Sequence, residues 1–147
     1  MALSIQKLSY TEVLELLNKA ENSFTPPLSH NIPYTLEEYA LRLANYAMFV
    51  ICKDNADTIG FLAYYENYEG RYAYIPQIWV SGEYQRQGIG SLMLCKMNSV
   101  LGREIRFVRL EVRIANKKAY DFYLKSGFIV VDEKDSKFIM EKQLQEG

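Results

Sequence analysis

The sequence has few of the residues from which metal sites are usually built. It contains one histidine, His30, and two cysteines, Cys52 and Cys95, among 147 residues. The cysteines are not at zinc-ligand spacing, so we expect no metal site. Both lie in segments of apolar pattern, which predicts two buried thiols.

Strong net charge and long hydrophobic runs are also absent. The formal net charge is −1, which argues against a general nucleic-acid or anionic-membrane partner. No apolar run is long enough to span a bilayer, and the N-terminus has no signal-type core. We therefore expect a cytoplasmic protein without nucleic-acid or membrane partners.

The balance of 49% hydrophobic and 24% charged residues predicts a globular protein, and the length predicts a single domain over residues 1–147. Two capping boxes, Ser9-x-x-Glu12 and Thr35-x-x-Glu38, predict where the first two helices begin. Pro26, Pro27 and Pro33 predict an irregular segment between these helices. The predicted helices are 9–20, 35–45, 91–101 and 116–126, and the predicted strands are 4–8, 48–52, 58–66, 72–80, 106–113, 128–131 and 137–141. This order favours a mixed α/β fold with a mostly antiparallel sheet.

The segment Gln85–Gly90, Gln-Arg-Gln-Gly-Ile-Gly, joins a predicted strand to a predicted helix. A strand that turns through two glycines into a helix presents bare backbone N–H groups, typical of a phosphate site. The segment lacks the Gly-Lys-Ser/Thr ending of a nucleoside-triphosphate loop and the third glycine of a dinucleotide loop. Taken alone, the two glycines are a weak signal and favour a tight strand-to-helix turn over a phosphate site.

A second set of residues follows at regular spacing: the strand 110–112, Asn116, the segment 119–123, and Gly127-Phe128. With the Gln-x-x-Gly-x-Gly loop, this order resembles the GNAT superfamily of acetyl-coenzyme A-dependent N-acetyltransferases, over about residues 72–143. The resemblance implies an acyltransferase with a six- to seven-stranded sheet, flanked by helices, whose central strands splay apart. Pro76 suits a bulge at such a splay.

The resemblance also implies acetyl-coenzyme A as co-substrate and gives each motif residue a role. Backbone N–H groups of the loop would bind the diphosphate, and the strand before the loop would pair with the pantetheine arm. Asn116, the N-cap of its helix, and the small residue Ala119 would lie near the cofactor. The implied cofactor-binding residues are Ile78, Trp79, Val80, Gln85, Arg86, Gln87, Gly88, Ile89, Gly90, Ser91, Asn116, Ala119 and Tyr123.

Tyr123 matches the tyrosine that serves the family as general acid. A tyrosine hydroxyl is protonated at neutral pH and can give a proton to the leaving thiolate of coenzyme A. The chain has twelve tyrosines, so packing is the alternative role for Tyr123, and we expect its neighbour Tyr120 to be structural.

Glu111 matches a glutamate that serves as general base in some protein-acetylating members of the family. The alternative is a strand glutamate that is solvated or paired with Arg109 or Arg113. Glu66 and Glu83 are weaker candidates for the base.

The acceptor is the least determined part of the prediction. The resemblance implies a primary amine on a small molecule, with an amino sugar considered, or alternatively on a protein or peptide. Tyrosines clustered at 64–74 form either a cross-strand ladder or a pocket wall. A GNAT-like module that binds an acyl-coenzyme A without turnover is the alternative from another class, and the oligomeric state, monomer or homodimer, stays open.

Overall fold

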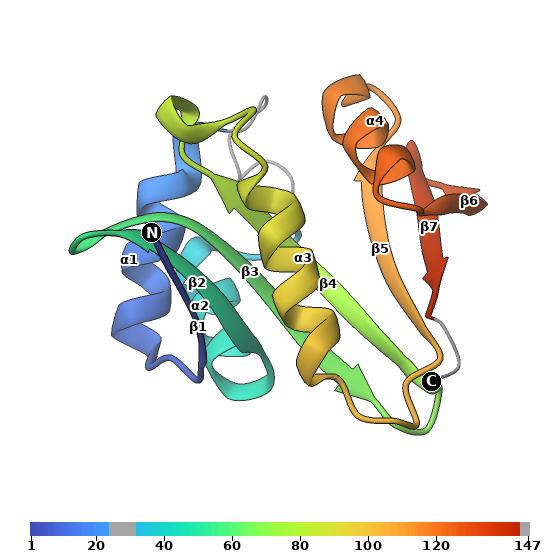
Figure 1. Cartoon of the computed structure of the whole chain (residues 1–147), viewed down its shortest axis with the longest axis horizontal. Helices are drawn as coiled ribbons and strands as arrows, with labels where there is room; N and C mark the ends of the chain where they lie inside the picture. Colours follow the sequence, from blue (N-terminus) through green and yellow to red (C-terminus); the bar gives the residue numbers. More distant parts are fainter. Residues whose placement is uncertain (24–31, 145–147) are drawn as a thin grey trace. The chain divides into compact units, whose positions relative to one another are not determined.

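The computed structural model describes residues 1–23 and 32–144. His30, Pro26 and Pro27 lie outside the described residues. Figure 1 shows the elements, which follow in the order β1 (Ala2–Gln6), α1 (Tyr10–Ala20), η1 (Glu21–Ser23), α2 (Leu36–Tyr46), β2 (Met48–Asp54), β3 (Asp57–Asn67), β4 (Tyr72–Val80), η3 (Gly82–Tyr84), α3 (Ile89–Val100), β5 (Phe107–Arg113), α4 (Lys117–Lys125), β6 (Ile129–Lys134) and β7 (Lys137–Gln143).

The strands form one seven-stranded sheet in the order β1-β2-β3-β4-β5-β7-β6. Strands β1 and β2, β5 and β7, and β6 and β7 pair antiparallel, whereas β4 and β5 pair parallel. The predicted mixed α/β fold with a mostly antiparallel sheet is confirmed. The chain divides into two compact units, Met1–Ala63 with Gln77–Ser99 and Tyr64–Pro76 with Val100–Gly147.

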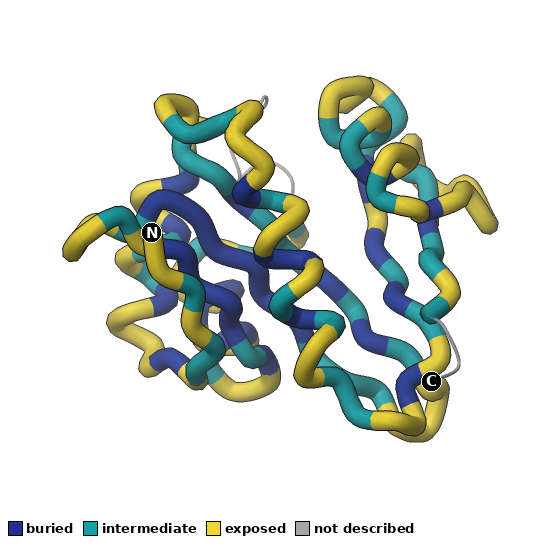
Figure 2. Tube along the Cα trace, viewed as in Figure 1, coloured by how far each residue is buried: buried dark blue, intermediate teal, exposed yellow. Residues whose placement is uncertain are grey.

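In the first unit, the sheet is packed between helices on both faces. Buried residues of α1, α2 and alternate positions of the strands form one cluster: Leu8, Val13, Leu17, Ala20, Tyr39, Ala40, Leu43, Ala47, Phe49, Ile51, Phe61, Ala63 and Trp79. Helix α3 packs on β3 at Gly60, where an added Cβ would lie 3.3 Å from Ile89 Cγ2 and 3.4 Å from Met93 Cε. Figure 2 shows how continuous the buried stretches of β2 and β3 are, as expected of strands covered on both faces.

The second unit is built on β5, β7 and β6, with α4 packed on β5. Its core includes Val108, Leu110, Tyr123, Phe128 and Met140. At one end of β5 the Phe107 and Tyr72 rings stack, with centroids 5.5 Å apart, and the Arg109 guanidinium lies over the Tyr72 ring. Strand β6 is different, because all six of its residues are exposed.

Helix starts were the most accurate part of the sequence prediction. Both capping boxes are present: Ser9 and Thr35 accept hydrogen bonds from the N–H groups of Glu12 and Glu38, whose side chains bond back. The exception is α3, which begins at Ile89 and not at Ser91. Since Gly88 can adopt a left-handed conformation before it, the helix begins as soon as the loop ends.

The parallel ladder between β4 and β5 is short. It runs from Tyr72 opposite Phe107 to Tyr74 opposite Arg109, and β5 then continues beside β7 to Arg113. The ladder stops two residues before Pro76, which has no N–H to donate. This early end is what splayed central strands predict.

The prediction of two buried thiols is half wrong. Cys52 is buried in β2, and burial raises the pKa of its thiol. Cys95 is exposed on α3. The buried stripe of α3 is narrower than the sequence pattern suggests, since Met93 and Met97 are buried but Leu92 and Val100 are about half exposed.

Candidate active site

The glycine loop of the first unit presents its backbone to solvent. Arg86 and Gly88 have φ angles of 68° and 78°, in the left-handed region, and both are exposed. A Cβ built on Gly88 meets no atom within 4 Å, so packing does not demand a glycine there. The backbone conformation does, because other L-residues are strained at this φ.

Helix α3 leaves its first amides available. Leu92 N–H donates to the Gly88 carbonyl over 3.0 Å. The N–H groups of Ile89, Gly90 and Ser91 precede this bond and have no acceptor within the helix. They follow two left-handed residues and lie at the positive end of the helix dipole, where backbone N–H groups favour an anion.

The two glycines differ in role from the sequence prediction, which placed both in the turn. Gly90 is the second residue of α3 and does not have a positive φ. Only Gly88, of the two, needs the freedom of glycine to form the turn.

The flanks of the loop are held by hydrogen bonds. Ser81 N–H donates to the Ile59 carbonyl over 2.8 Å, and Gln85 Nε2 donates to the Val80 carbonyl over 3.2 Å. Tyr84 Oη donates to Asp54 Oδ2 over 2.6 Å. The sequence analysis assigned no role to Tyr84 or Asp54, and no motif signals a contact between residues thirty positions apart.

Strand β4 carries the three residues predicted to pair with a pantetheine arm. Ile78 and Val80 are half-buried, and Trp79 is buried with its ring 5.9 Å from that of Phe61. The Trp79 indole N–H is buried and has no hydrogen-bond partner. Trp79 is thus a core residue of the first unit, and what remains for ligand binding at this position is its backbone.

In the second unit, Asn116 caps α4 as predicted. Its side-chain oxygen accepts a hydrogen bond from Ala119 N–H over 3.2 Å. Gly127, the glycine of the second motif, follows the C-cap residue Ser126 and has a φ of 99°. One left-handed residue just past the cap is the usual way to end a helix.

Tyr123 is the buried residue of α4. Its ring packs against the rings of Phe122 and Phe128, with centroids 5.3 and 5.7 Å away, and 7% of the residue is exposed. Burial raises the pKa of the Tyr123 hydroxyl far above its usual value, because the charged phenolate is poorly solvated there. The hydroxyl is therefore protonated at neutral pH and gives up its proton less readily than a solvated tyrosine does. Tyr120 packs on Phe138 as the expected structural neighbour.

Glu111 has a partner that the sequence analysis missed. Tyr74 Oη donates to Glu111 Oε2 over 2.9 Å, from β4 to β5. The alternative pairing of Glu111 with Arg109 is wrong, since Arg109 Nη2 lies 2.7 Å from Glu141 Oε2. The exposed Glu111 carboxylate is thus fixed by a neutral hydroxyl and not by a neighbouring charge.

The clustered tyrosines pack in ring pairs. Tyr65 and Tyr74 have centroids 5.4 Å apart, and Tyr64 is buried. Of the two expectations for this cluster, cross-strand packing describes these contacts. Glu66 accepts hydrogen bonds from Gly102 N–H and Tyr68 Oη, which gives this weaker candidate for the base a structural role.

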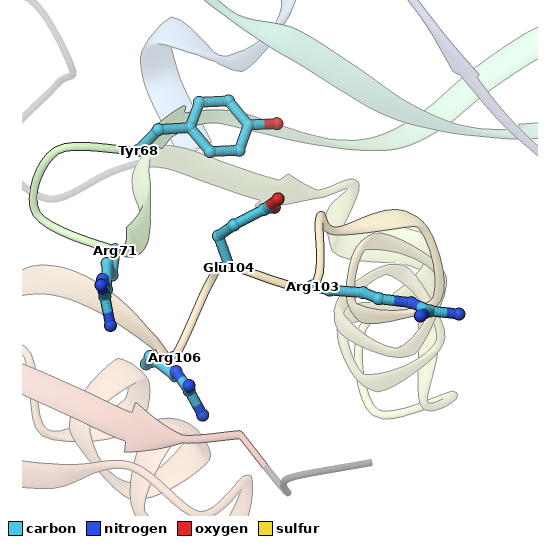
Figure 3. Close-up of a pocket in the computed structure, with 5 residues that line it drawn as sticks. All are labelled: Tyr68, Arg71, Arg103, Glu104 and Arg106. Atoms are coloured by element: carbon cyan, nitrogen blue, oxygen red, sulfur yellow. The ribbon is translucent and has the colours of Figure 1, made fainter.

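A cavity of about 380 Å³ lies elsewhere in the second unit, and no sequence-predicted site residue lines it. Figure 3 shows its lining side chains: Tyr68, Arg71, Arg103, Glu104 and Arg106. All five are exposed, and the Glu104 carboxylate points toward Tyr68, away from the guanidinium groups of Arg71 and Arg106. A hollow so open to water gives a bound anion little desolvated contact.

Residues 1–23 and 32–144 contain neither a metal-binding cluster nor a membrane-spanning helix. No group of three or more His, Cys, Asp or Glu side chains is placed to hold a metal ion. Within the same residues, no helix is both long and apolar enough to cross a membrane.

The profile of the Acetyltransferase (GNAT) family matches residues 11–128. The thialysine N-epsilon-acetyltransferase of Bos taurus is 38% identical over 73 residues, which cover 47% of this chain and 43% of the relative. The spermidine N(1)-acetyltransferase of Thermoplasma acidophilum is 33% identical over 70 residues, which cover 47% and 44%. The matches thus span less than half the length of these curated relatives.

A solved structure extends the similarity to nearly the whole chain. The PaiA N-acetyltransferase from Thermoplasma acidophilum, in complex with coenzyme A, matches with a TM-score of 0.77 and 25% identity. The match covers 98% of this chain and 100% of that one.

Proposed function

The chain belongs to the GNAT acetyltransferase family, and on this premise we propose that it transfers an acetyl group from acetyl-coenzyme A to a primary amine. The amine attacks the thioester carbonyl directly: a C–N bond forms, the C–S bond breaks, and coenzyme A leaves as a thiol. The co-substrate supplies the activated acetyl group, and the protein supplies binding, orientation and proton transfer.

The glycine loop is the observation that carries this proposal. The amides of residues 89–91 lie in the first turn of α3, before the first bond of the helix, and a Cβ at Gly88 would meet open space. That donor set fits the diphosphate of coenzyme A, because backbone N–H groups and the helix dipole both favour an anion. Arg86 adds a positive charge next to these amides, and Ser91 adds a hydroxyl donor.

Strand β4 offers a second fit. Its ladder with β5 ends at Tyr74, before Ile78, Trp79 and Val80. We assign the backbone of these three residues to the amides of the pantetheine arm, which would add to β4 as an extended strand does. Asn116 and Ala119, at the start of α4, complete the proposed cofactor-binding set.

Tyr123 is the proposed general acid. Its hydroxyl gives a proton to the sulfur as the C–S bond breaks. The phenolate is restored by the proton that the nitrogen loses after the C–N bond has formed, directly or through water. Because burial raises the Tyr123 pKa, the hydroxyl carries its proton at neutral pH and releases it only to the negative charge that develops on the sulfur.

Glu111 is the proposed general base. An aliphatic amine is mostly an ammonium ion at neutral pH and must lose a proton before it can attack. The Glu111 carboxylate accepts that proton, directly or through water, while the hydrogen bond from Tyr74 fixes its orientation.

For the acceptor, we propose a small aliphatic amine. The relatives that match this chain are named for thialysine and spermidine, which both carry primary aliphatic amines. Amino sugars and peptide amines are the competing classes, and the test below separates them.

The test is acetyl-dependent release of thiol by the purified protein in the presence of amines. The panel contains spermidine, a lysine analogue, glucosamine and a lysine-containing peptide, with a Gly88→Val variant as the control for loop-dependent turnover. We expect thiol release with at least one aliphatic amine and acetylation of that amine, seen by mass spectrometry. Tight coenzyme A binding without turnover of any amine would favour a non-catalytic acyl-coenzyme A module instead.

A further inference from the structure

The segment before the glycine loop is tied to a distant strand by one short hydrogen bond. Tyr84 Oη lies 2.6 Å from Asp54 Oδ2, and both residues are half-buried. Tyr84 ends η3, four residues before Gly88, and Asp54 ends β2. A hydroxyl-to-carboxylate bond of this length belongs to the stronger, charge-assisted class.

The loop itself contributes few contacts that could hold its shape. Arg86, Gln87 and Gly88 are exposed, and the Gln87 side chain bonds only four residues back, to the Glu83 carbonyl. A short loop with two left-handed residues and exposed side chains has many alternative conformations in solution. The conformation of the loop therefore depends more on the contacts at its two ends than on its own side chains.

Both ends of the loop are anchored on one hairpin. At the start, Tyr84 bonds to Asp54 at the end of β2. At the end, Ile89 is buried against β3, where Gly60 allows the close approach of α3. The β2–β3 hairpin thus fixes the two ends of the loop before any ligand binds.

We propose that Asp54 and Tyr84 are positioning residues that pre-organise the glycine loop for the diphosphate of coenzyme A. The inference rests on the proposed function, because it assigns the pair to the same loop. Neither side chain contacts the ligand. Without the bond, the loop must become ordered when the ligand binds, and the lost conformational entropy weakens binding.

Protonation favours the same arrangement. The hydrogen bond to Asp54 raises the Tyr84 pKa above its usual value, with further increases from partial burial and from the carboxylates of Asp54, Glu83 and Asp57. Tyr84 therefore stays a donor over the pH range in which an acetyltransferase is assayed.

The experiment uses Tyr84→Phe, Asp54→Ala and the double variant, with Tyr46→Phe as the matched control. Tyr46 is 72% exposed at the end of α2. Calorimetry gives the Kd for coenzyme A, and steady-state kinetics give kcat and KM with acetyl-coenzyme A and with S-acetylpantetheine, which lacks the diphosphate. Thermal unfolding confirms that each variant is folded.

We expect each single variant to raise the Kd for coenzyme A about 3- to 10-fold, which corresponds to the net free energy of one hydrogen bond. The double variant should be no worse than the singles, because both substitutions break the same bond. Values of kcat, and of kcat/KM with S-acetylpantetheine, should be unchanged, as should every parameter of Tyr46→Phe.

Two results would overturn the inference alone: wild-type Kd in both single variants, or an equal loss of kcat/KM with both acetyl donors. The first would mean that the bond does not order the loop, and the second that it stabilises the fold as a whole. Failure of the wild-type protein to bind coenzyme A would instead overturn the proposed function, and this inference with it.

Discussion

The glycine loop exposes its backbone, whereas helix α4 buries the side chain that we propose as the general acid. Around Gly88 the groups proposed for binding are main-chain amides that any sequence possesses. In α4 the proposed group is one hydroxyl, on Tyr123, among three packed aromatic rings. Ligand binding by the loop therefore depends on the absence of a side chain at Gly88. The proposed role of α4 depends on the buried position of one tyrosine.

The difference extends to how each region tunes its electrostatics. The loop offers partial charges of amides in water, which a diphosphate can reach without structural change. Tyr123 is removed from water, and this burial is what shifts its pKa. Substitutions in the loop should therefore lower the affinity for coenzyme A, whereas substitution of Tyr123 should lower kcat.

The largest expected effect is on rate, in Tyr123→Phe. Loss of a general acid should lower kcat by roughly 10²–10⁴-fold, with little change in the Kd for coenzyme A. Tyr120→Phe, on the same helix, is the control and should keep near-normal kcat. If chemistry is rate-limiting and kcat survives in Tyr123→Phe, then Tyr123 is a packing residue and another group protonates the sulfur.

The pH dependence of kcat tests the buried environment of Tyr123. Because burial raises the Tyr123 pKa, the hydroxyl keeps its proton past the ordinary tyrosine value of about 10. We expect no loss of wild-type kcat from tyrosine ionisation below that pH. A falling limb centred near pH 9 that is absent in Tyr123→Phe would contradict the buried environment.

The second effect is on affinity, in Gly88→Val. The side chain covers the amides and strains a backbone whose φ is 78°, so loss of hydrogen bonds to a charged ligand should raise the Kd for coenzyme A roughly 10- to 100-fold. Gly82→Val is the control, since a Cβ at Gly82 also meets open space and no positive φ is involved. Equal effects of the two substitutions on the Kd would remove the assignment of the loop as the diphosphate site.

A smaller effect is expected at Glu111. Glu111→Gln should lower kcat/KM for the amine most strongly at low pH, where the acceptor is most fully protonated, by about tenfold or more. Tyr74→Phe should give a weaker effect with the same pH dependence, because only the orientation of the carboxylate is lost. Glu133→Gln, on the exposed strand β6, controls for the charge change. A uniform loss at all pH values would argue against a base.

The smallest effect is expected at Asn116, which combines a cap with a proposed cofactor contact. Asn116→Ala should cost about 1 kcal/mol of unfolding free energy, whereas Asn116→Asp should retain the cap. Denaturant unfolding and coenzyme A titration separate the roles. If Asp restores stability but not affinity, the amide has a role in binding beyond the cap; if it restores both, the cap alone explains the residue.

Elements with local signals could be predicted closely from the sequence. The capping boxes at Ser9 and Thr35 lie within one residue of the helix starts, and the strand 72–80 was predicted with its observed ends. These signals are local because a cap or an apolar alternation acts within a few residues. Exposure of Cys95 was missed because α3 is covered by β3 along a narrow stripe, which sequence alone does not define.

The candidate site also contains residues with local sequence signals and residues without them. Gly88 and Asn116 lie in motifs, so their positions could be predicted; Gly88 has the left-handed φ of a turn glycine, and Asn116 caps its helix. The partners Tyr74 and Tyr84 could not be predicted, since each bond joins residues at least thirty positions apart. In a chain with twelve tyrosines, only the folded arrangement distinguishes a hydroxyl that holds a carboxylate from one that faces water.

Strand β6 has a consequence for how the protein behaves at high concentration. It is one of the two outer strands of the sheet, and it begins with three exposed apolar residues, Ile129, Val130 and Val131. An open edge of that kind can recruit strands from other molecules and start aggregation. Here the register shifts between Val130 and Asp132, and the strand ends in Asp132, Glu133 and Lys134. The irregular backbone and the charged end disfavour pairing with a strand of another molecule, because such pairing requires a flat, regular edge. We therefore expect the exposed edge of β6 not to promote aggregation.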